Sequence, residues 1–319
     1  MTELLTSTAN WLNSGDEVVI EKSPREEPGW WAGAPNATRD EEWGRYYLYY
    51  RLRRPRGQGR GYGARIAVSQ DGFQFKDVWS IGQEELNSPS IERGHLIRRG
   101  NEWVLYLSYV NGETNQWQID RIAGPSVEQL NVKDRIPVLT PVDVAGHAVK
   151  DPFVLRVGPL WYMYVSYAPK ELLAPVNGDL HASQDVFTTG AVKSHTGFAI
   201  SMDGDHYFWQ GEVLGSSASG WDSLVSRLSG ILPMDGVFLA FYDGASRVEE
   251  NYEERGGLAV SGDLKHFSKL MQSEPWFQSA YGSARYMCPV VTPMGTILYY
   301  EAASSTGSHY LCGRRVSWR

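Results

Sequence analysis

Cysteine is nearly absent from this sequence, and its scarcity excludes several classes of protein. Only Cys288 and Cys312 occur among the 319 residues. Two thiols cannot form a disulfide framework and cannot complete a four-ligand metal site by themselves. The histidines show no zinc-ligand spacing. We therefore expect reduced thiols, a cytoplasmic location, and neither a metal ion nor a cofactor.

Long apolar runs and an excess of basic charge are missing as well. No run of about 18 apolar residues is present to span a membrane. The N-terminal stretch also lacks the basic segment and apolar core of a signal peptide. A formal net charge of −7 leaves no basic footprint for nucleic acid. We expect a protein that binds neither membranes nor nucleic acid.

Aromatic residues, glycine and proline are abundant instead. The chain contains 12 Trp, 18 Tyr and 10 Phe, together with 33 Gly and 16 Pro. Aromatic and β-branched residues favour strands, whereas glycine and proline favour the turns between them. The composition therefore predicts many short strands joined by turns.

The strands recur in a repeated order. Each repeat begins with an apolar run, continues through a short turn into an aromatic run, and ends with two further strand-like segments. The repeats start about 50 to 70 residues apart, a period typical of propeller blades. The predicted blades are approximately 30–81, 88–135, 149–214, 221–272 and 283–316.

A repeat of about four antiparallel strands, present five times, predicts an all-β, five-bladed β-propeller that forms a single domain over residues 1–319. The last repeat shows only three clear strands. Residues 1–28 form an N-terminal extension, and its segment EVVIEK (17–22) is a candidate fourth strand that would close the ring. The alternative is a β-sandwich with an additional domain, which leaves the internal repetition unexplained.

Several of these segments resemble the five-bladed propeller glycosidases: the arabinanase and xylosidase-like enzymes, the β-fructosidases and the β-mannoside phosphorylases. The resemblance covers about residues 30–316. It is carried by RYYLYYR and ARIAVSQDGFQF in blade one, by KDPFVL and LWYMYVSY in blade three, and by GGLAVSGDLKHF in blade four. These motifs identify blades and are not catalytic signatures by themselves.

The resemblance implies a central funnel in which carboxylates cleave a glycosidic bond. In such enzymes one carboxylic acid protonates the leaving oxygen, and a second carboxylate assists from the opposite face of the sugar. Asp151, which precedes Pro152, matches the family's aspartate in blade three. Asp222 in WDSLVSR lies where the acid of blade four is expected, although the family has glutamate there.

The sequence departs from the family pattern in two blades. In blade one, Ala34 precedes Pro35 at the position where the family places the aspartate that acts as the general base. In blade two, the aspartate of the phosphorylases would fall near Ser88 or Ser90, where no carboxylate stands. Glu92 lies two to four residues later, so its side chain is expected on the same face of the strand as these serines. It is the third catalytic candidate.

Further residues near the predicted inner strands are candidates for substrate binding. Arginine and lysine among carboxylates suit sugar hydroxyls or an anionic group, and aromatic side chains suit stacking on sugar rings. The alternative for each of them is a structural role, as an ion pair or a packed side chain within the ring of blades. The candidates are Trp31, Asn36, Arg51, Lys150, Arg227, Arg285, Tyr286 and Glu301.

Two loops are open to either interpretation. The segment RRPRGQGRGYG (53–63) is the most basic part of the chain, and it is either a solvated loop or a loop over the funnel that holds an anionic ligand group. The acidic insertion SRVEENYEERGG (246–257) is either a solvated excursion or a source of a catalytic acid, with Glu250 and Glu253 as candidates.

The sequence leaves three functions open. The first is a glycoside hydrolase-like enzyme that acts on a small glycoside or oligosaccharide. The second is a saccharide-binding propeller without hydrolysis. The third is an acid/base enzyme of small-molecule biosynthesis, such as a cyclase, lyase or isomerase. A fold alone does not separate them, because sites are grafted onto folds.

Overall fold

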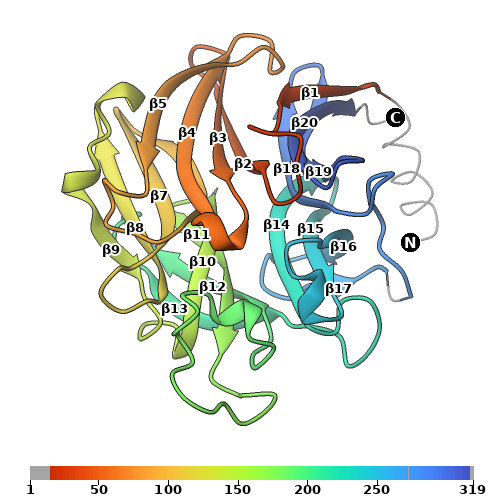
Figure 1. The fold of residues 1–319 in the computed structure, drawn as a ribbon. Coiled ribbons are helices and arrows are strands. Elements are labelled where there is room, and N and C mark those ends of the chain that lie inside the picture. Colours follow the sequence, from red (N-terminus) through yellow and green to blue (C-terminus); the bar gives the residue numbers. More distant parts are fainter. Residues whose placement is uncertain (1–14, 272, 317–319) are drawn as a thin grey trace.

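A computed structural model describes residues 15–271 and 273–316. Their strands form sheets arranged around a central axis, in chain order around the ring (Figure 1). The strands are β1 (Glu17–Glu21), β2 (Trp31–Asp40), β3 (Arg45–Arg53), β4 (Gly61–Ser69), β5 (Lys76–Gly82), β6 (Ile91–Arg99), β7 (Glu102–Val110), β8 (Trp117–Gly124), β9 (Ile136–Leu139), β10 (Gly146–Val157), β11 (Leu160–Pro169), β12 (His195–Ser201), β13 (Phe208–Leu214), β14 (Val225–Met234), β15 (Val237–Ala245), β16 (Arg255–Ser261), β17 (Ser268–Lys269), β18 (Ala284–Thr292), β19 (Gly295–Ala303) and β20 (His309–Val316).

The sheets are the five blades of a β-propeller, as predicted. Blade one is β2–β5, blade two β6–β9, blade three β10–β13, blade four β14–β17, and blade five β18–β20 with β1. In every blade, consecutive strands pair antiparallel. Short 3-10 helices in the connections are η1 (Arg56–Gln58), η2 (Val127–Gln129), η3 (Val132–Asp134), η4 (Val186–Thr188) and η5 (Val248–Glu250).

The N-terminal strand closes the last blade, as the sequence suggested. β1 pairs antiparallel with β20, with Glu17 opposite Arg314. One parallel bridge, between Trp31 and His309, also joins blade five to blade one. The first and last described strands therefore lie side by side, and β1 covers the outer edge of β20.

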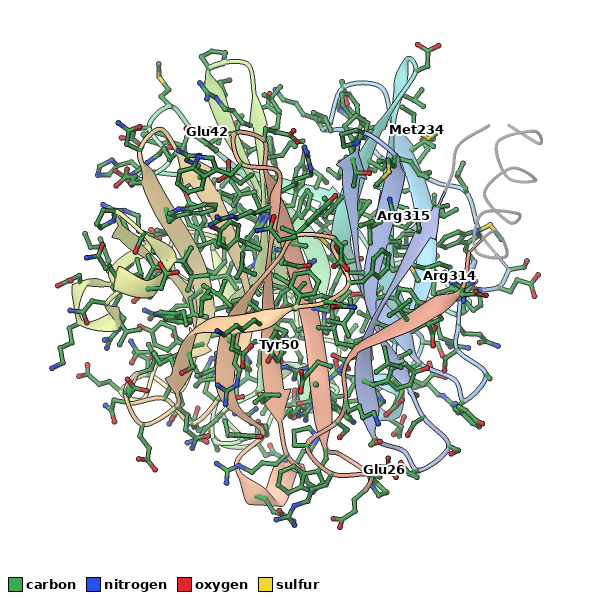
Figure 2. The ribbon with its side chains drawn as sticks, turned by 90° about the horizontal axis from the view of Figure 1, so that it is seen from above. Glu26, Glu42, Tyr50, Met234, Arg314 and Arg315 are labelled. Atoms are coloured by element: carbon green, nitrogen blue, oxygen red, sulfur yellow. The ribbon has the colours of Figure 1, made fainter. Side chains whose placement is uncertain are left out.

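The hydrophobic cores lie between neighbouring blades. Tyr47 of blade one packs against Trp103 of blade two, with ring centroids 4.4 Å apart. Aromatic side chains from blades three and four form a similar cluster, in which Trp221 stacks on Tyr242. Figure 2 shows side chains filling the space between the sheets. Because apolar groups are buried between the blades, the axis is left to polar residues.

The first strand of each blade faces the axis and carries a β-bulge. β2 contacts β6 and β18, β10 contacts β6 and β14, and β14 contacts β18. At each bulge, one or two residues of the first strand have no pairing partner in the second strand. A bulge of this kind changes the direction in which the local side chains point. The residues skipped in this pairing are Ala34 and Pro35, Glu92 and Arg93, Asp151 and Pro152, Ser229, and Tyr286 and Met287.

Three of these bulges place a non-glycine residue at positive φ. Ala34, Asp151 and Tyr286 have φ values of 52°, 57° and 56°. L-residues rarely adopt this region, and each instance costs of order 1–3 kcal/mol unless the surroundings compensate. Glu92 is the corresponding bulge residue of blade two, so Glu92 and Asp151 occupy equivalent positions in adjacent blades.

Candidate active site

A buried ring of alternating charges surrounds the axis, and Glu301 is one of its carboxylates. Its oxygens lie 2.7 Å from Arg285 Nη2, 3.2 Å from Arg51 Nη2 and 2.7 Å from His309 Nδ1. The backbone N–H of Ala34 donates a hydrogen bond to Oε2. Burial alone would raise the pKa of Glu301, but Arg285, His309 and Arg51 together hold it well below its ordinary value.

A glycine makes room for this carboxylate. A Cβ added at Gly33 would lie 1.9 Å from Glu301 Oε2, well inside van der Waals contact. The absence of a side chain at Gly33 therefore lets the carboxylate of blade five approach the backbone of blade one. The contact is a direct link across the closure of the propeller.

Glu254 is the next acid in the ring and comes from the acidic insertion before β16. Its oxygens pair with Arg285 Nη1 and, at 2.9 Å, with Arg227 Nη1. Burial opposes ionisation, but the two guanidinium groups outweigh it and lower the pKa of Glu254. Arg227 also donates hydrogen bonds to Asn251 and Ser194. The insertion thus folds inward, as one of the two sequence interpretations allowed, but through Glu254.

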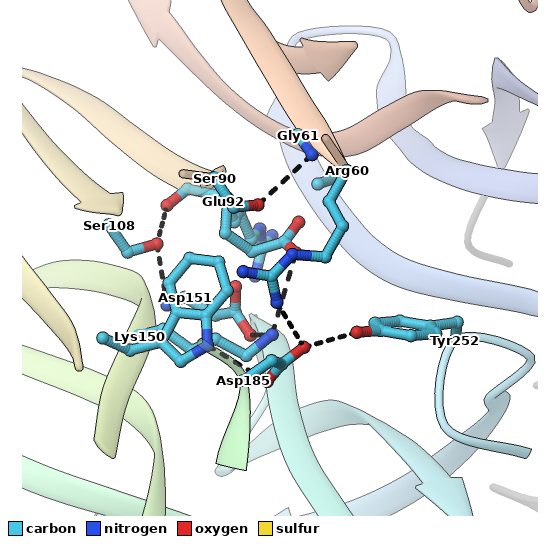
Figure 3. A network of polar contacts seen from close by, with 12 residues as sticks. Arg60, Gly61, Ser90, Glu92, Ser108, Lys150, Asp151, Asp185 and Tyr252 are labelled. Carbon is cyan, nitrogen blue, oxygen red and sulfur yellow. Dashed lines mark hydrogen bonds and ion pairs between the residues drawn. The ribbon is translucent and has the colours of Figure 1, made fainter. Parts of the chain in front are cut away.

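Lys150 joins the remaining acids of the ring. Its Nζ lies 3.8 Å from Glu92 Oε2 and 3.6 Å from Asp151 Oδ2. Glu92 Oε1 is 3.0 Å from Arg51 Nε, which continues the ring to Glu301. Figure 3 shows Glu92, Lys150 and Asp151 side by side. The charge of Asp151 in turn favours the ionised form of Arg227. Positive and negative side chains therefore alternate around the axis.

Asp151 is the acid of the ring in which both carboxylate oxygens are buried without a hydrogen-bond donor among the described residues. Glu92 shares this condition at one oxygen, Oε1, which has only its ion pair with Arg51. Only the backbone of Asp151 is fixed: its N–H donates to Ser108 Oγ, and Ser108 donates to the carbonyl of Arg93. A buried carboxylate without hydrogen bonds is costly. The oxygens of Asp151 therefore retain hydrogen-bonding capacity that no described residue uses.

A polar cover lies over this part of the ring, centred on Asp185 from the connection between β11 and β12. Its carboxylate pairs with Arg60 Nη1 at 3.2 Å, and Trp117 Nε1 and Tyr252 Oη donate hydrogen bonds to it (Figure 3). Burial opposes ionisation, but Arg60 and Lys150 lower the pKa of Asp185. Three separate connections therefore meet above the ring.

Asp222 lies apart from the ring, contrary to its predicted role beside Asp151. It is fully buried on the flank of blade four, and its Oδ2 is 2.6 Å from Nζ of Lys269 in the outermost strand β17. Tyr242 donates a hydrogen bond to the same oxygen. The reason is that Asp222 precedes β14, and the chain turns towards the axis only at Arg227. We therefore do not pair Asp222 with Asp151.

The remaining predicted binding residues lie close to the ring but are largely engaged. Asn36 Nδ2 donates to the carbonyl of Pro152, which ties blade one to blade three. Trp31 stacks on His309, with centroids 4.4 Å apart. Tyr286 is buried, and burial raises its pKa well above the ordinary value. Arg51, Arg227 and Arg285 are all held by carboxylates of the ring.

Sequence reasoning missed several residues that reach the axis. Four of them lie in connections between strands, and five lie in strands of several blades, including the first strand β6 and the third strands β8 and β20. Arg53 had a usable signal, because it lies two residues after Arg51 in a strand and therefore shares its face. The missed residues are Arg53, Arg60, Arg93, Trp117, Asp185, Asp243, Tyr252, Glu254 and His309.

Asp243 gives the site a pH-dependent stability. Burial, and then the charge of Glu254, raise its pKa to about 7. A raised carboxyl pKa stabilises the native state below the unfolded value, and that stability is lost as the pH rises through 7. We expect wild type to lose on the order of 4 kcal/mol between pH 4 and 8 relative to Asp243→Asn. Urea unfolding of both proteins at pH 4 and pH 8 measures this change; an unchanged difference would contradict it.

Neither a metal site nor a membrane helix is found in the described ranges. No group of three or more His, Cys, Asp or Glu side chains there could hold a metal ion. No helix there is long and apolar enough to cross a membrane.

No protein-family model and no curated protein matches the sequence. Solved structures do match. One described as a glycoside hydrolase has a TM-score of 0.71 at 12% identity and covers 100% of this chain and 98% of its own. A GH43_1 enzyme from Xanthomonas citri, complexed with xylotriose, has a TM-score of 0.61 at 13% identity, with coverages of 97% and 92%. A beta-1,2-mannobiose phosphorylase from Listeria innocua, complexed with its disaccharide, has a TM-score of 0.59 at 14% identity, with coverages of 92% and 92%.

These likenesses show the fold. Each extends over nearly the whole of both chains at a TM-score above 0.5, with identities of 12 to 14%. The predicted resemblance to the five-bladed propeller glycosidases and phosphorylases is therefore confirmed at the level of architecture. What the chain itself does has to be argued from its own site.

Proposed function

We propose that this protein is a glycoside hydrolase-like enzyme that acts on a small glycoside or oligosaccharide at the axis of the propeller. Asp151 and Glu92 are the proposed catalytic carboxylates. Two of the matching structures contain a bound oligosaccharide, xylotriose in one and mannobiose in the other. The same ligand class is therefore proposed for this chain.

The observation that carries the proposal is the state of Asp151. This residue combines a positive φ of 57°, nearly complete burial and two carboxylate oxygens without hydrogen bonds. Each feature costs free energy. Strain and unsatisfied polar groups of this kind cluster where a ligand completes the interactions. A purely structural aspartate would be expected to have donors around it.

Glu92 supplies the second carboxyl group. It occupies the equivalent bulge of the adjacent blade, and Lys150 Nζ lies 3.8 Å from Glu92 and 3.6 Å from Asp151. Because both acids contact one atom, their facing oxygens are at most 7.4 Å apart, the total of the two distances. One carboxyl would protonate the leaving oxygen as the glycosidic bond breaks, and the other would assist attack of water at the sugar carbon.

A panel of aryl glycosides and oligosaccharides tests this assignment. We expect wild type to turn over at least one member, and Glu92→Gln to reduce that turnover by 10²-fold or more, the usual contribution of acid/base catalysis. Asp222→Asn is the matched control, since it also removes a buried acid with a lysine partner. Equal losses in both variants would indicate a stability effect and remove Glu92 from the chemistry.

A saccharide-binding protein without hydrolysis is the second candidate. One observation favours it: the bulges of blades one and four carry no carboxylate, because Ala34 and Ser229 stand there. Saccharide binding measured by calorimetry, with no turnover of any glycoside in the panel, would replace the enzymatic proposal by this one. The cytoplasmic location expected from the sequence stays a prediction.

A further inference from the structure

Arg53 is a buried cation next to the proposed site that the catalytic ring does not use. It belongs to β3 and lies two residues after Arg51, on the same face of the strand. Its guanidinium carbon is 4.1 Å from the ring centre of Trp31 and 3.8 Å from that of Tyr252. The guanidinium therefore lies in the corner formed by two aromatic rings, whose centroids are 5.9 Å apart.

No anion within the described residues neutralises this guanidinium. Arg51, Arg227 and Arg285 each pair with carboxylates. In contrast, Arg53 makes no ion pair, and its Nε and Nη1 atoms are buried without an acceptor. Burial lowers the pKa of Arg53 to about 10, so the group still carries its charge at neutral pH. Stacking on aromatic rings offsets only part of the cost of burying a cation.

The charge balance of the whole axis points in the same direction. Among the described residues near the axis, the buried arginine and lysine side chains exceed the buried acids by one, with His309 left out of the count. Nearby buried acids at Asp40, Asp120 and Asp222 have their own partners outside the ring. The seven cations are Arg51, Arg53, Arg60, Arg93, Lys150, Arg227 and Arg285, and the six acids are Glu92, Asp151, Asp185, Asp243, Glu254 and Glu301.

We propose that Arg53 binds the carboxylate of an acidic saccharide, so that the substrate of this site is a uronic-acid-containing glycoside. The inference rests on the proposed function and specifies its substrate class. The planar fork of a guanidinium matches a carboxylate with two parallel hydrogen bonds. A single negative charge would also offset the charge of Arg53; Arg93, the other buried arginine without an ion pair in the described residues, instead donates to the carbonyls of Pro35 and Ser229. Trp31 Nε1, which likewise lacks an acceptor, is a further donor beside Arg53.

The cover above the ring would have to move for such a ligand to reach Arg53. Tyr252 lies on the guanidinium and donates a hydrogen bond to Asp185. Its backbone φ of 99° is strained for a tyrosine. Asp185 also pairs with Arg60, which places an internal carboxylate among the cations of the funnel mouth. An acidic ligand would compete with that carboxylate for the same kind of partner.

Calorimetric titration tests the inference with defined probes. Glucuronate, galacturonate and mannuronate are compared at millimolar concentration with glucose, galactose and mannose, which differ only in the acidic group. We expect at least one uronate to bind ten times more tightly than its neutral counterpart. Arg53→Gln should reduce that ratio to within twofold, and Arg53→Lys should retain part of it, because lysine keeps the charge but not the fork.

Arg56→Gln is the control, because Arg56 also lies over Tyr252 but is exposed. It should leave the ratio unchanged. Far-UV circular dichroism and thermal melting of each variant establish that it is folded. Uronates that bind no better than neutral sugars, or a preference that survives in Arg53→Gln, would overturn the inference. Inorganic phosphate that binds through Arg53 while no uronate does so would overturn the carboxylate assignment.

The two proposals can fail separately. Absence of turnover for every glycoside, with Arg53-dependent binding of a uronate, would remove the catalytic proposal and leave the binding site. Turnover of neutral glycosides that depends on Asp151 but not on Arg53 would keep the enzyme and remove the acidic substrate class.

Discussion

Replacing Asp151 by asparagine is expected to reduce turnover of a glycoside substrate by 10²- to 10⁴-fold. Asparagine keeps the shape of the side chain but can neither accept a proton as a carboxylate does nor attack as a nucleophile. The fold should tolerate the change. Asparagine is among the residues that adopt positive φ most readily, and the replaced oxygens make no hydrogen bonds.

Stability separates this expectation from a structural effect. We expect the unfolding free energy of Asp151→Asn in urea to stay within about 1 kcal/mol of wild type, because Lys150 retains Glu92 as a partner. Turnover that stays within tenfold of wild type would exclude Asp151 from the chemistry. A large loss of stability would show instead that the ion pair with Lys150 holds the axis together.

Replacing Glu301 by glutamine is expected to have the largest effect on stability. The substitution leaves Arg285 and Arg51 without the carboxylate that both contact, and it weakens the interaction with His309. Removing one partner from a buried ion pair typically costs 3–5 kcal/mol, because the remaining charge stays buried. That is a large part of the roughly 5–15 kcal/mol that stabilises a typical native protein.

Urea unfolding at pH 7 measures this loss, with Glu253→Gln as the control. Glu253 also contacts His309, at 3.3 Å, but its side chain is 46% exposed. Exposed pairs contribute about 0–1 kcal/mol, so the control should change little. The pKa of Glu301 is held well below its ordinary value, so its contribution is present above the unfolded pKa and is lost as the pH falls through the folded one. A loss below 1 kcal/mol in Glu301→Gln would show that the ring does not support the propeller.

The sequence by itself determined the architecture, because blades are local. An apolar strand, a turn and an aromatic strand encode one hairpin, and five such repeats predict five blades. The closing strand could also be predicted, because the last repeat lacked one strand and polar and apolar residues alternate in EVVIEK as in a strand. Asp151 was found through the resemblance, because the Asp-Pro pair in KDPFVL matches the blade-three aspartate of the propeller glycosidases.

Only the tertiary structure decided which other charges reach the axis. Asp222 has a favourable sequence position, yet it turns to Lys269 on the flank of blade four. Glu254 and Asp185 lie in insertions whose paths depend on packing against distant blades, and no local period predicts that path. Arg53 has no ion pair because the nearby carboxylates are paired with other cations, and this pairing is visible only in the folded protein. Strand and turn propensities act over a few residues, whereas neutralisation of a buried charge depends on groups up to 250 residues away, as between Arg51 and Glu301.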